Sequence, residues 1–392
     1  MRIPIFKTVA MPARLFWAPM MLACANFAVQ MAIMVALMGA YPGAINPQFF
    51  LVSLVVVHGF LIVLGTQEPH ISTLLQSWGQ SCSCWKKDGT LNTDKLKPTL
   101  LPNGEGVQIK ERWVKIVRLR TEGSFAADWT KWLTAMARYP VEVQVWVSNR
   151  EEKLIILSAK IQKGDYRLKE ALQDTLSLLA VFGPEELSDA DASQIWMKIL
   201  SERVKFLKTS YSLLAEDSHT YEAYIGINRL GDDMDTNMMA DLLSLDGDIQ
   251  LQHRIKSIPT PKANASLIQQ RKLSFFTSFS QNVYNQYTKV LEAIDSVRDF
   301  SQIVTTYSVS IRIKAPTVAE LEGLIVQAVA VLKQYDFQAV REKATVKAIY
   351  AGQFAAIVCA PRRYTLLSDG VVAALNTVRK GGSTGVYGGV RY

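Results

Sequence analysis

A long uncharged stretch near the N-terminus constrains this chain more than any other feature. No Asp, Glu, Lys or Arg occurs from Leu15 to Gln67, and most residues there are apolar. Residues 15–40 and 49–65 are each long enough to cross a bilayer core of about 30 Å as a helix. Between them, "YPGAINPQ" (41–48) is typical of a turn. The sequence therefore predicts a two-helix transmembrane hairpin.

Basic residues lie on both sides of this hairpin and are missing from its turn. They are Arg2, Lys7 and Arg14 before it and Lys86, Lys87, Lys95 and Lys97 after it. Because Lys and Arg favour the cytoplasmic side, we expect both termini and the soluble part to be cytoplasmic. The first apolar segment is too long for a signal peptide, and a second one follows directly. Asn26 or Gln30 is expected to bond to the second helix or to a partner's helix, and His58 alone does not indicate transport.

Composition and cysteine usage exclude several classes of protein. The chain is 49% hydrophobic and 20% charged, which is typical of a folded protein. The net charge is +8, but the Lys and Arg residues are interspersed with Asp and Glu, so nucleic-acid binding is not predicted. Cys24, Cys82, Cys84 and Cys359 do not form a disulfide pattern, which favours a reducing compartment. Cys82 and Cys84 lack the second ligand pair of a zinc site, even with His70 upstream, and are interpreted as free thiols.

The soluble part begins after a polar, turn-rich segment (66–104) that is typical of a linker. Apolar periodicity then predicts alternating strands and helices. The expected strands are 107–120, 141–149, 153–161 and 220–228, and the expected helices are 125–140, 165–182 and 188–209. This β-α-β-β-α-(α)-β order predicts an α+β fold with a ferredoxin-like layer.

The second half is predicted to be richer in helix. Thr317 and Glu320 form a capping box before an apolar helix. Further helices are expected at 236–245, within 262–300 and at 366–378, and strands at 302–315 and 344–361. The predicted division of the chain is 1–14 N-terminal tail, 15–65 hairpin, 66–104 linker, 105–230 first α/β subdomain, 231–378 helical and second α/β subdomain, and 379–392 Gly-rich hinge or tail.

An acidic stretch, "GDDMDTNMMADLLSLDGD" (231–248), is the nearest approach to a metal site. A calcium loop starting at Asp233 needs Gly at its sixth position and Glu at its twelfth, where this chain has Met238 and Ser244. We interpret the stretch as a polar turn in which Asp235 or Thr236 caps a helix.

No catalytic, cofactor-binding or metal-ligating residue is predicted anywhere in the chain. His58, His70, His219 and His253 are scattered, and neither G-x-S-x-G nor H-E-x-x-H occurs. The closing "RKGGSTGVYGGVRY" (379–392) has its lysine before the glycines, and the chain has no Gly-Lys dipeptide, so it is not a phosphate loop. The aromatic stretch "LSFFTSFSQNVYNQY" (273–287) is interpreted as core packing, with a base-stacking surface or a partner groove as alternatives.

Three segments of the soluble part resemble the N-terminal region of the CagE/TrbE/VirB family, the large ATPases of type IV secretion and conjugation systems. They are "INRLGDDMDTNMMADLLSLDGDIQLQHRIKSIPTPKA", "YSVSIRIKAPTVAELEGLIVQAVAVLKQYDFQAVRE" with its Arg341-Glu342 pair, and "QFAAIVCAPRRYTLLSDGVVAAL". The resemblance covers residues 220–380 well and 105–220 loosely. It implies a role in a secretion machine, whereas the family's RecA-like motor with its phosphate loop has no counterpart here.

The start of the chain resembles the small two-span inner-membrane subunit of the same systems. "MPARLFWAPMMLACAN" and "QEPHISTLLQSW" are similar to its proline-led first helix and to its segment after the membrane. Together the resemblances imply a multi-copy inner-membrane scaffold that docks ATPases and neighbouring subunits, without a cofactor. One alternative is the front of a secretion ATPase whose nucleotide-binding domain lies beyond residue 392. The other is an unrelated membrane-anchored adaptor.

Overall fold

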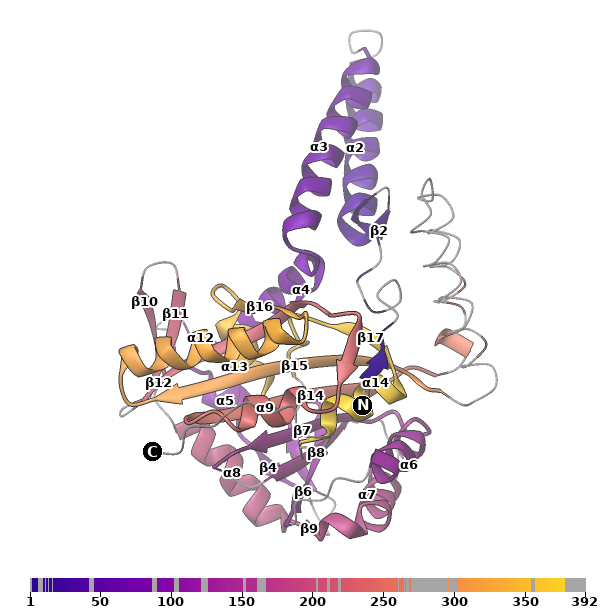
Figure 1. Cartoon of the computed structure of the whole chain (residues 1–392). Coiled ribbons are helices and arrows are strands. Elements are labelled where there is room, and N and C mark those ends of the chain that lie inside the picture. Colours follow the sequence, from indigo (N-terminus) through magenta and orange to yellow (C-terminus); the bar gives the residue numbers. More distant parts are fainter. Residues whose placement is uncertain are drawn as a thin grey trace.

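The protein combines helices and sheet, with two apolar helices followed by a sheet-rich body, as the computed structural model in Figure 1 shows. The structure describes residues 2–5, 10, 12, 14–15, 17–41, 46–86, 90–101, 106–120, 126–150, 153–160, 167–201, 204–209, 212–217, 220–259, 261–263, 265, 268, 295, 302–353 and 357–377. The predicted aromatic helix within 262–300 lies almost entirely outside these ranges, as do His219 and the Gly-rich segment 379–392.

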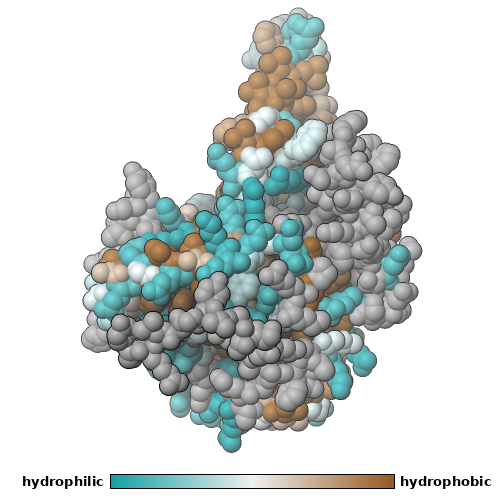
Figure 2. Space-filling model, viewed as in Figure 1, coloured by the Kyte–Doolittle hydropathy of each residue, from teal (hydrophilic) through white to brown (hydrophobic). Residues whose placement is uncertain are grey.

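The hairpin consists of α2 (Met20–Ala40) and α3 (Gln48–Gln67), both long and apolar enough to cross a membrane. Apolar side chains make up much of its surface in Figure 2, and Phe49 is 74% exposed. The prediction that a polar residue of the first helix bonds to the second is confirmed for Gln30, whose Nε2 donates to Ser53 Oγ at 3.0 Å. The helices project from the body as a pair (Figure 1).

The first helix begins later than the predicted residue 15. Arg14–Leu15 (β2) and Ala18–Pro19 (β3) pair as a short ribbon, and α2 starts directly after Pro19. Gly65 near the end of α3 lets the two helices approach here, because a Cβ on Gly65 would lie 2.6 Å from Pro19 Cδ. The base of the hairpin is therefore closely packed.

The chain is attached to the body both before and after the hairpin. The N-terminal strand β1 (Arg2–Pro4) pairs with β13 (Asp233–Asp235). The segment predicted as a linker contains α4 (Ile71–Cys82), α5 (Thr93–Leu96) and β4 (Thr99–Leu100). Because α4 packs against the body, much of this segment is part of the fold.

The first half of the body has the element order β-α-β-β-α-β. Its elements are β6 (Arg112–Leu119), α6 (Ala126–Met136), β7 (Glu142–Ser148), β8 (Lys153–Lys160), α7 (Arg167–Leu178) and β9 (Pro184–Glu186). The strands lie side by side in the antiparallel order β9-β6-β8-β7. The short β9 is thus the fourth strand, and the prediction that 220–228 fills this place is wrong.

The second half repeats the same order. Its elements are β12 (Thr220–Arg229), α9 (Met238–Leu243), β14 (Asp248–Ser257), β15 (Val304–Ala315), α12 (Val318–Gln334) and β16 (Gln338–Arg341). Here the antiparallel order is β16-β12-β15-β14. Because β14 also pairs with β7, the strands of these two sets join in one sheet, while, among the described strands, β13 pairs only with β1. The predicted domain division at residue 230 stays a prediction.

Strand alternation gives this sheet two buried faces. Val143, Val145 and Val147 of β7 point to one core, whereas Trp146 points to the other. The first face is covered by α6, α7, α9, α12 and α14 (Ser368–Leu375). The second face is covered by α4, α8 (Asp189–Ser201) and α13 (Val346–Gly352). The segment after the hairpin therefore joins the body on the second face, whereas Ile5, before the hairpin, packs into the core on the first face.

Two secondary-structure predictions are wrong and one detail is confirmed. The expected strand 344–361 contains the helix α13 instead. Every residue of α13 except Lys347 is buried, so its run of apolar residues does not distinguish a buried helix from a buried strand. The expected helix 188–209 ends at Ser201, and β10 (Lys205–Thr209) then forms a hairpin with β11 (Ser212–Asp217). The remaining described strands are β5 (Val107–Ile109) and β17 (Tyr364–Leu367). The Thr317 cap is confirmed, since Glu320 N donates to its Oγ1 at 3.2 Å.

Candidate functional site

The most densely bonded polar region is the place where the hairpin meets the body, which we call the membrane junction. It comprises Glu68 and α4 on the hairpin side, and residues 357–364 and the end of β12 on the body side. Gln67 ends α3, and Pro69 cannot continue a helix, so the chain turns here and restarts as α4. The turn places Glu68 against the body.

Arg362 is the centre of the membrane junction. Its Nη1 and Nη2 donate to the two carboxylate oxygens of Glu68 at 2.7 and 3.0 Å, and its Nε donates to Glu342 Oε1 at 2.6 Å. Nη1 also donates to Asn228 Oδ1 at 2.8 Å. The Arg362 and Glu342 side chains are 6% and 3% exposed, while Glu68 is 24% exposed. One guanidinium thus ties the start of α4 to two segments of the body.

The electrostatics of this arrangement favour the charged form of Arg362. Burial opposes its charge, but the hydrogen bond to Glu68 and the negative charge of Glu342 outweigh burial and raise the pKa of Arg362 above its ordinary value. Gly226 leaves the space that the guanidinium needs, because a Cβ there would lie 2.9 Å from Arg362 Cδ. The ion network is therefore both charged and tightly enclosed.

His70 lies beside this network at the start of α4. Its ring is fully buried and meets the ring of Tyr364 edge-on, with the centroids 4.9 Å apart. Burial, followed by the positive charge of Arg362, lowers the pKa of His70 to about 4. His70 is therefore neutral near pH 7, and acid makes its burial unfavourable.

One face of α4 continues the attachment along the body. Thr73, Gln76 and Gln80 are spaced by three and four residues and so share a side of the helix. Thr73 Oγ1 donates to Pro361 O, and Gln76 Oε1 accepts from Arg363 Nη2. Gln80 Oε1 accepts from the backbone N–H of Cys359 at 2.8 Å. These hydrogen bonds are spread along one side of α4, so they fix the orientation of the helix on the body.

Two arginines bind the last turn of α3. Arg229 Nη2 donates to Thr66 O at 2.6 Å, and Arg14 Nη2 donates to Gly65 O at 3.0 Å. The last carbonyls of a helix lack partners within the helix and carry partial negative charge, so cations stabilise them. The base of the hairpin is thus bonded both to the body and to the segment before α2.

Residues singled out from the sequence do not gather into a reactive centre. Within the described part of the chain, no group of three or more His, Cys, Asp or Glu is placed to hold a metal ion. His70 and Cys82 occupy opposite ends of α4, and His253 is buried on the first face beside Tyr307. Asp235 Oδ1 accepts from Asn237 N at 2.9 Å, so the acidic stretch turns before α9. The prediction that Asp235 or Thr236 caps this helix is wrong, because its N-cap residue is Asn237, which makes no side-chain cap bond in the described structure.

Sequence reasoning missed the membrane junction itself. Glu68 and Arg362 are 294 positions apart, and no local pattern relates them. The only signal is that Glu68 is the first charge after the uncharged stretch, so it lies where the chain leaves the membrane.

Comparison with known proteins finds a similarity over part of the chain. Residues 191–363 match the model of the CagE, TrbE, VirB family, described as a component of the type IV transporter system. No curated protein gives a significant match to the chain. The matched region holds Asn228, Glu342 and Arg362, whereas Glu68 and α4 precede it. The membrane junction therefore connects the matched region to the hairpin.

Proposed function

We propose that this chain, whose residues 191–363 are a CagE/TrbE/VirB-family region of a type IV transporter component, is an inner-membrane scaffold that docks the secretion ATPase. The observation that carries the proposal is the membrane junction, which fastens a family region directly to a hairpin suited to span a membrane. A docking role needs a body that keeps its place relative to the bilayer. The family match argues against an unrelated adaptor.

The bonds of the membrane junction support a stiff attachment. Arg362 makes a two-point ion pair with Glu68, and the attachment continues along α4 as far as Gln80. On the other side of the hairpin, β1 pairs with β13 of the body. A hairpin held at both of its ends transmits its position in the bilayer to the body.

Several finer features belong to the same proposal. Basic residues flank the hairpin and are missing from its turn, which supports a cytoplasmic body and cytoplasmic termini in a bacterial inner membrane. We propose that the protein assembles in several copies with other secretion subunits and binds neither cofactor nor nucleic acid directly. The strand orders β9-β6-β8-β7 and β16-β12-β15-β14 support a ferredoxin-like layering that occurs twice.

The proposal is tested by where the secretion ATPase resides in cells. In a strain that lacks this gene, we expect the ATPase to move from the membrane fraction to the soluble fraction and substrate transfer to fail. Expression of the wild-type chain should restore both. An ATPase that remains membrane-bound in the deletion strain would contradict the docking role.

The family match equally fits a second function, the N-terminal part of a secretion ATPase. That reading requires a strand–GxxxxGK[ST]–helix encoded downstream of Tyr392. Sequencing the gene past this codon separates the two proposals: an open reading frame with such a motif supports the ATPase, and a stop codon supports the scaffold.

A further inference from the structure

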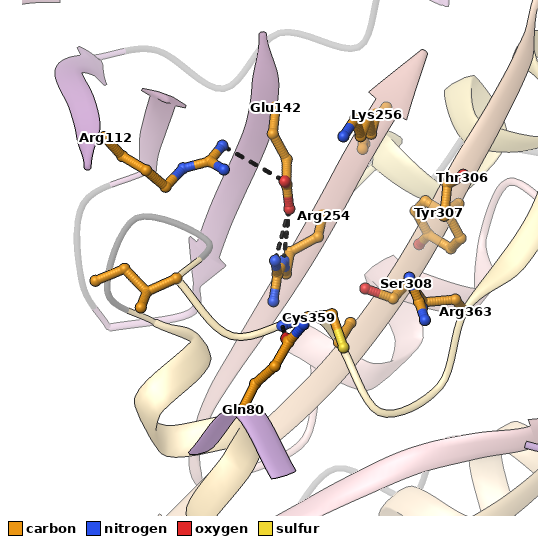
Figure 3. A pocket seen from close by; sticks show the side chains of 13 residues that line it. Gln80, Arg112, Glu142, Arg254, Lys256, Thr306, Tyr307, Ser308, Cys359 and Arg363 are labelled. Carbon is orange, nitrogen blue, oxygen red and sulfur yellow. Dashed lines mark hydrogen bonds and ion pairs between the residues drawn. The ribbon is translucent and has the colours of Figure 1, made fainter. Parts of the chain in front are cut away.

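A basic cavity of about 280 Å³ lies on the second face beside the membrane junction. Figure 3 shows its side chains coming from β6, β7, β14, β15 and the segment 357–363. Gln80 near the end of α4 also lines it, so the cavity touches both sides of the membrane junction. Nothing in the anchoring role requires a cavity here.

The lining carries more positive than negative charge. The lining holds four cationic side chains, Arg112, Arg254, Lys256 and Arg363, and one carboxylate, Glu142. Only Arg112 and Arg254 point to Glu142 in Figure 3. Arg254 Nη2 donates to Glu142 Oε1 at 2.6 Å, and Arg112 Nη2 lies 3.5 Å from Glu142 Oε2. Burial opposes the charge of Glu142, but Arg254 and Arg112 outweigh it and lower the pKa of that carboxyl. One negative charge is thus shared by two arginines, and two further cations remain.

Some of these cations have unused donors. Arg112 Nε and Arg363 Nε are buried, and neither has a hydrogen-bond partner among the described residues. Both atoms have almost no accessible surface, so they contribute positive charge beneath the cavity wall rather than open donor positions. The hydroxyl groups of Thr306 and Ser308 add uncharged donors to the same lining.

We propose that this cavity binds a small phosphate-bearing anion, held by Arg112, Lys256 and Arg363. Several guanidinium groups around one space match the tetrahedral oxygens of a phosphate, and hydroxyl groups complete such sites. The cavity lies near the lower limit of ligand pockets, about 300 Å³, which suits a diphosphate rather than a large molecule. The phosphate belongs either to a soluble molecule or to a lipid headgroup.

Binding here would strengthen the membrane junction. Arg112 belongs to β6 and Lys256 to β14, whereas Arg363 holds Gln76 of α4. An anion shared by these side chains connects the sheet to the helix that follows the membrane. This inference does not depend on the identity of the docking partners.

The test uses the full chain in phosphatidylcholine nanodiscs with sodium pyrophosphate as the probe. We expect calorimetry to detect binding that weakens as salt rises. Lys256 is exposed, so Lys256→Gln should leave the fold intact while weakening binding about tenfold, the loss of one charge-assisted bond. Lys131→Gln is the matched control, because Lys131 is an exposed lysine on α6, which covers the first face.

Cys359 gives a local readout, since it lines the cavity while Cys82 lies exposed outside it. Pyrophosphate should slow alkylation of Cys359, but not of Cys82, as followed by peptide mass spectrometry. In phosphatidylglycerol nanodiscs, slow alkylation of Cys359 without pyrophosphate would assign the phosphate to lipid. The proposal is overturned if neither probe protects Cys359, or if Lys256→Gln binds pyrophosphate as tightly as Lys131→Gln does.

Discussion

The Glu68–Arg362 contact offers a direct way to weaken the membrane junction without unfolding the body. Replacement of Arg362 would leave Glu342, 3% exposed, as a buried carboxylate without its cation, a change that costs about 3–5 kcal/mol. Glu68→Gln is milder, because Glu68 is 24% exposed and Arg362 keeps Glu342. We expect Glu68→Gln to cost about 1.5–3 kcal/mol, the worth of hydrogen bonds to a charged group.

That cost should appear as local opening of α4. A loss of about 1.5–3 kcal/mol corresponds to a roughly 10- to 150-fold increase in the open population. Hydrogen exchange of the full chain in nanodiscs should therefore show amides of α4 exchanging faster by this factor, while β7 and β14 exchange as in the wild type. Glu111→Gln, at an exposed glutamate before β6, is the control.

Two results would refute this reasoning. If α4 of Glu68→Gln exchanges within twofold of Glu111→Gln, the ion pair does not hold the helix. If the amides of α4 and of the sheet both exchange faster in Glu68→Gln, the substitution has destabilised the whole domain, and α4 does not open locally.

Three further predictions concern acid, packing and capping. His70 has a folded pKa of about 4, below its ordinary 6.5, so stability is retained above pH 6.5 and falls as the pH drops towards 4, with about 2 kcal/mol lost by pH 5. Thermal unfolding at pH 7 and pH 5 should show that His70→Gln loses less stability between the two pH values than the wild type does. The loss that remains comes from His253, whose burial lowers its pKa to about 3. If His70→Gln loses as much stability as the wild type, His70 is not the cause. Gly65→Ala should destabilise the hairpin by about 1–3 kcal/mol through its clash with Pro19, and unchanged thermal stability would contradict that packing. Thr317→Ala should cost about 1 kcal/mol in thermal unfolding, whereas Thr317→Ser should cost little.

The elements that could be predicted from the sequence are those with long, regular patterns. The hairpin, with helices at 20–40 and 48–67, follows from its uncharged length, and strand β7 follows from its alternating valines. Helix α12 follows from its Thr317 cap and its apolar run. In each case the signal lies within the element itself.

The central strand β14 shows why other elements were missed. Ile249, Leu251 and Ile255 alternate on the first face, but the residues between them include Gln250 and Arg254. These polar residues lie in the sheet and bond on its second face, so they give the strand the composition of a surface loop. Burial on both faces of one large sheet cannot be read from a single segment.

The candidate site was missed for a related reason. Its residues come from the turn after α3, from β12 and from the segment before β17, and only the three-dimensional structure brings them together. The cavity likewise depends on arginines from β6, β14 and the segment 357–363. Sequence resemblance located the region that matches the family model, and the structure shows how that region is bonded to the hairpin.

The central claim is that this chain is a membrane-anchored docking component of a type IV transporter. Affinity purification of the tagged full chain from bacterial membranes in a mild detergent, followed by mass spectrometry and sizing, tests it most directly. We expect the chain in the membrane fraction, in a large complex with the secretion ATPase and other inner-membrane subunits. A chain that fractionates as a soluble monomer, without these partners, would contradict the claim.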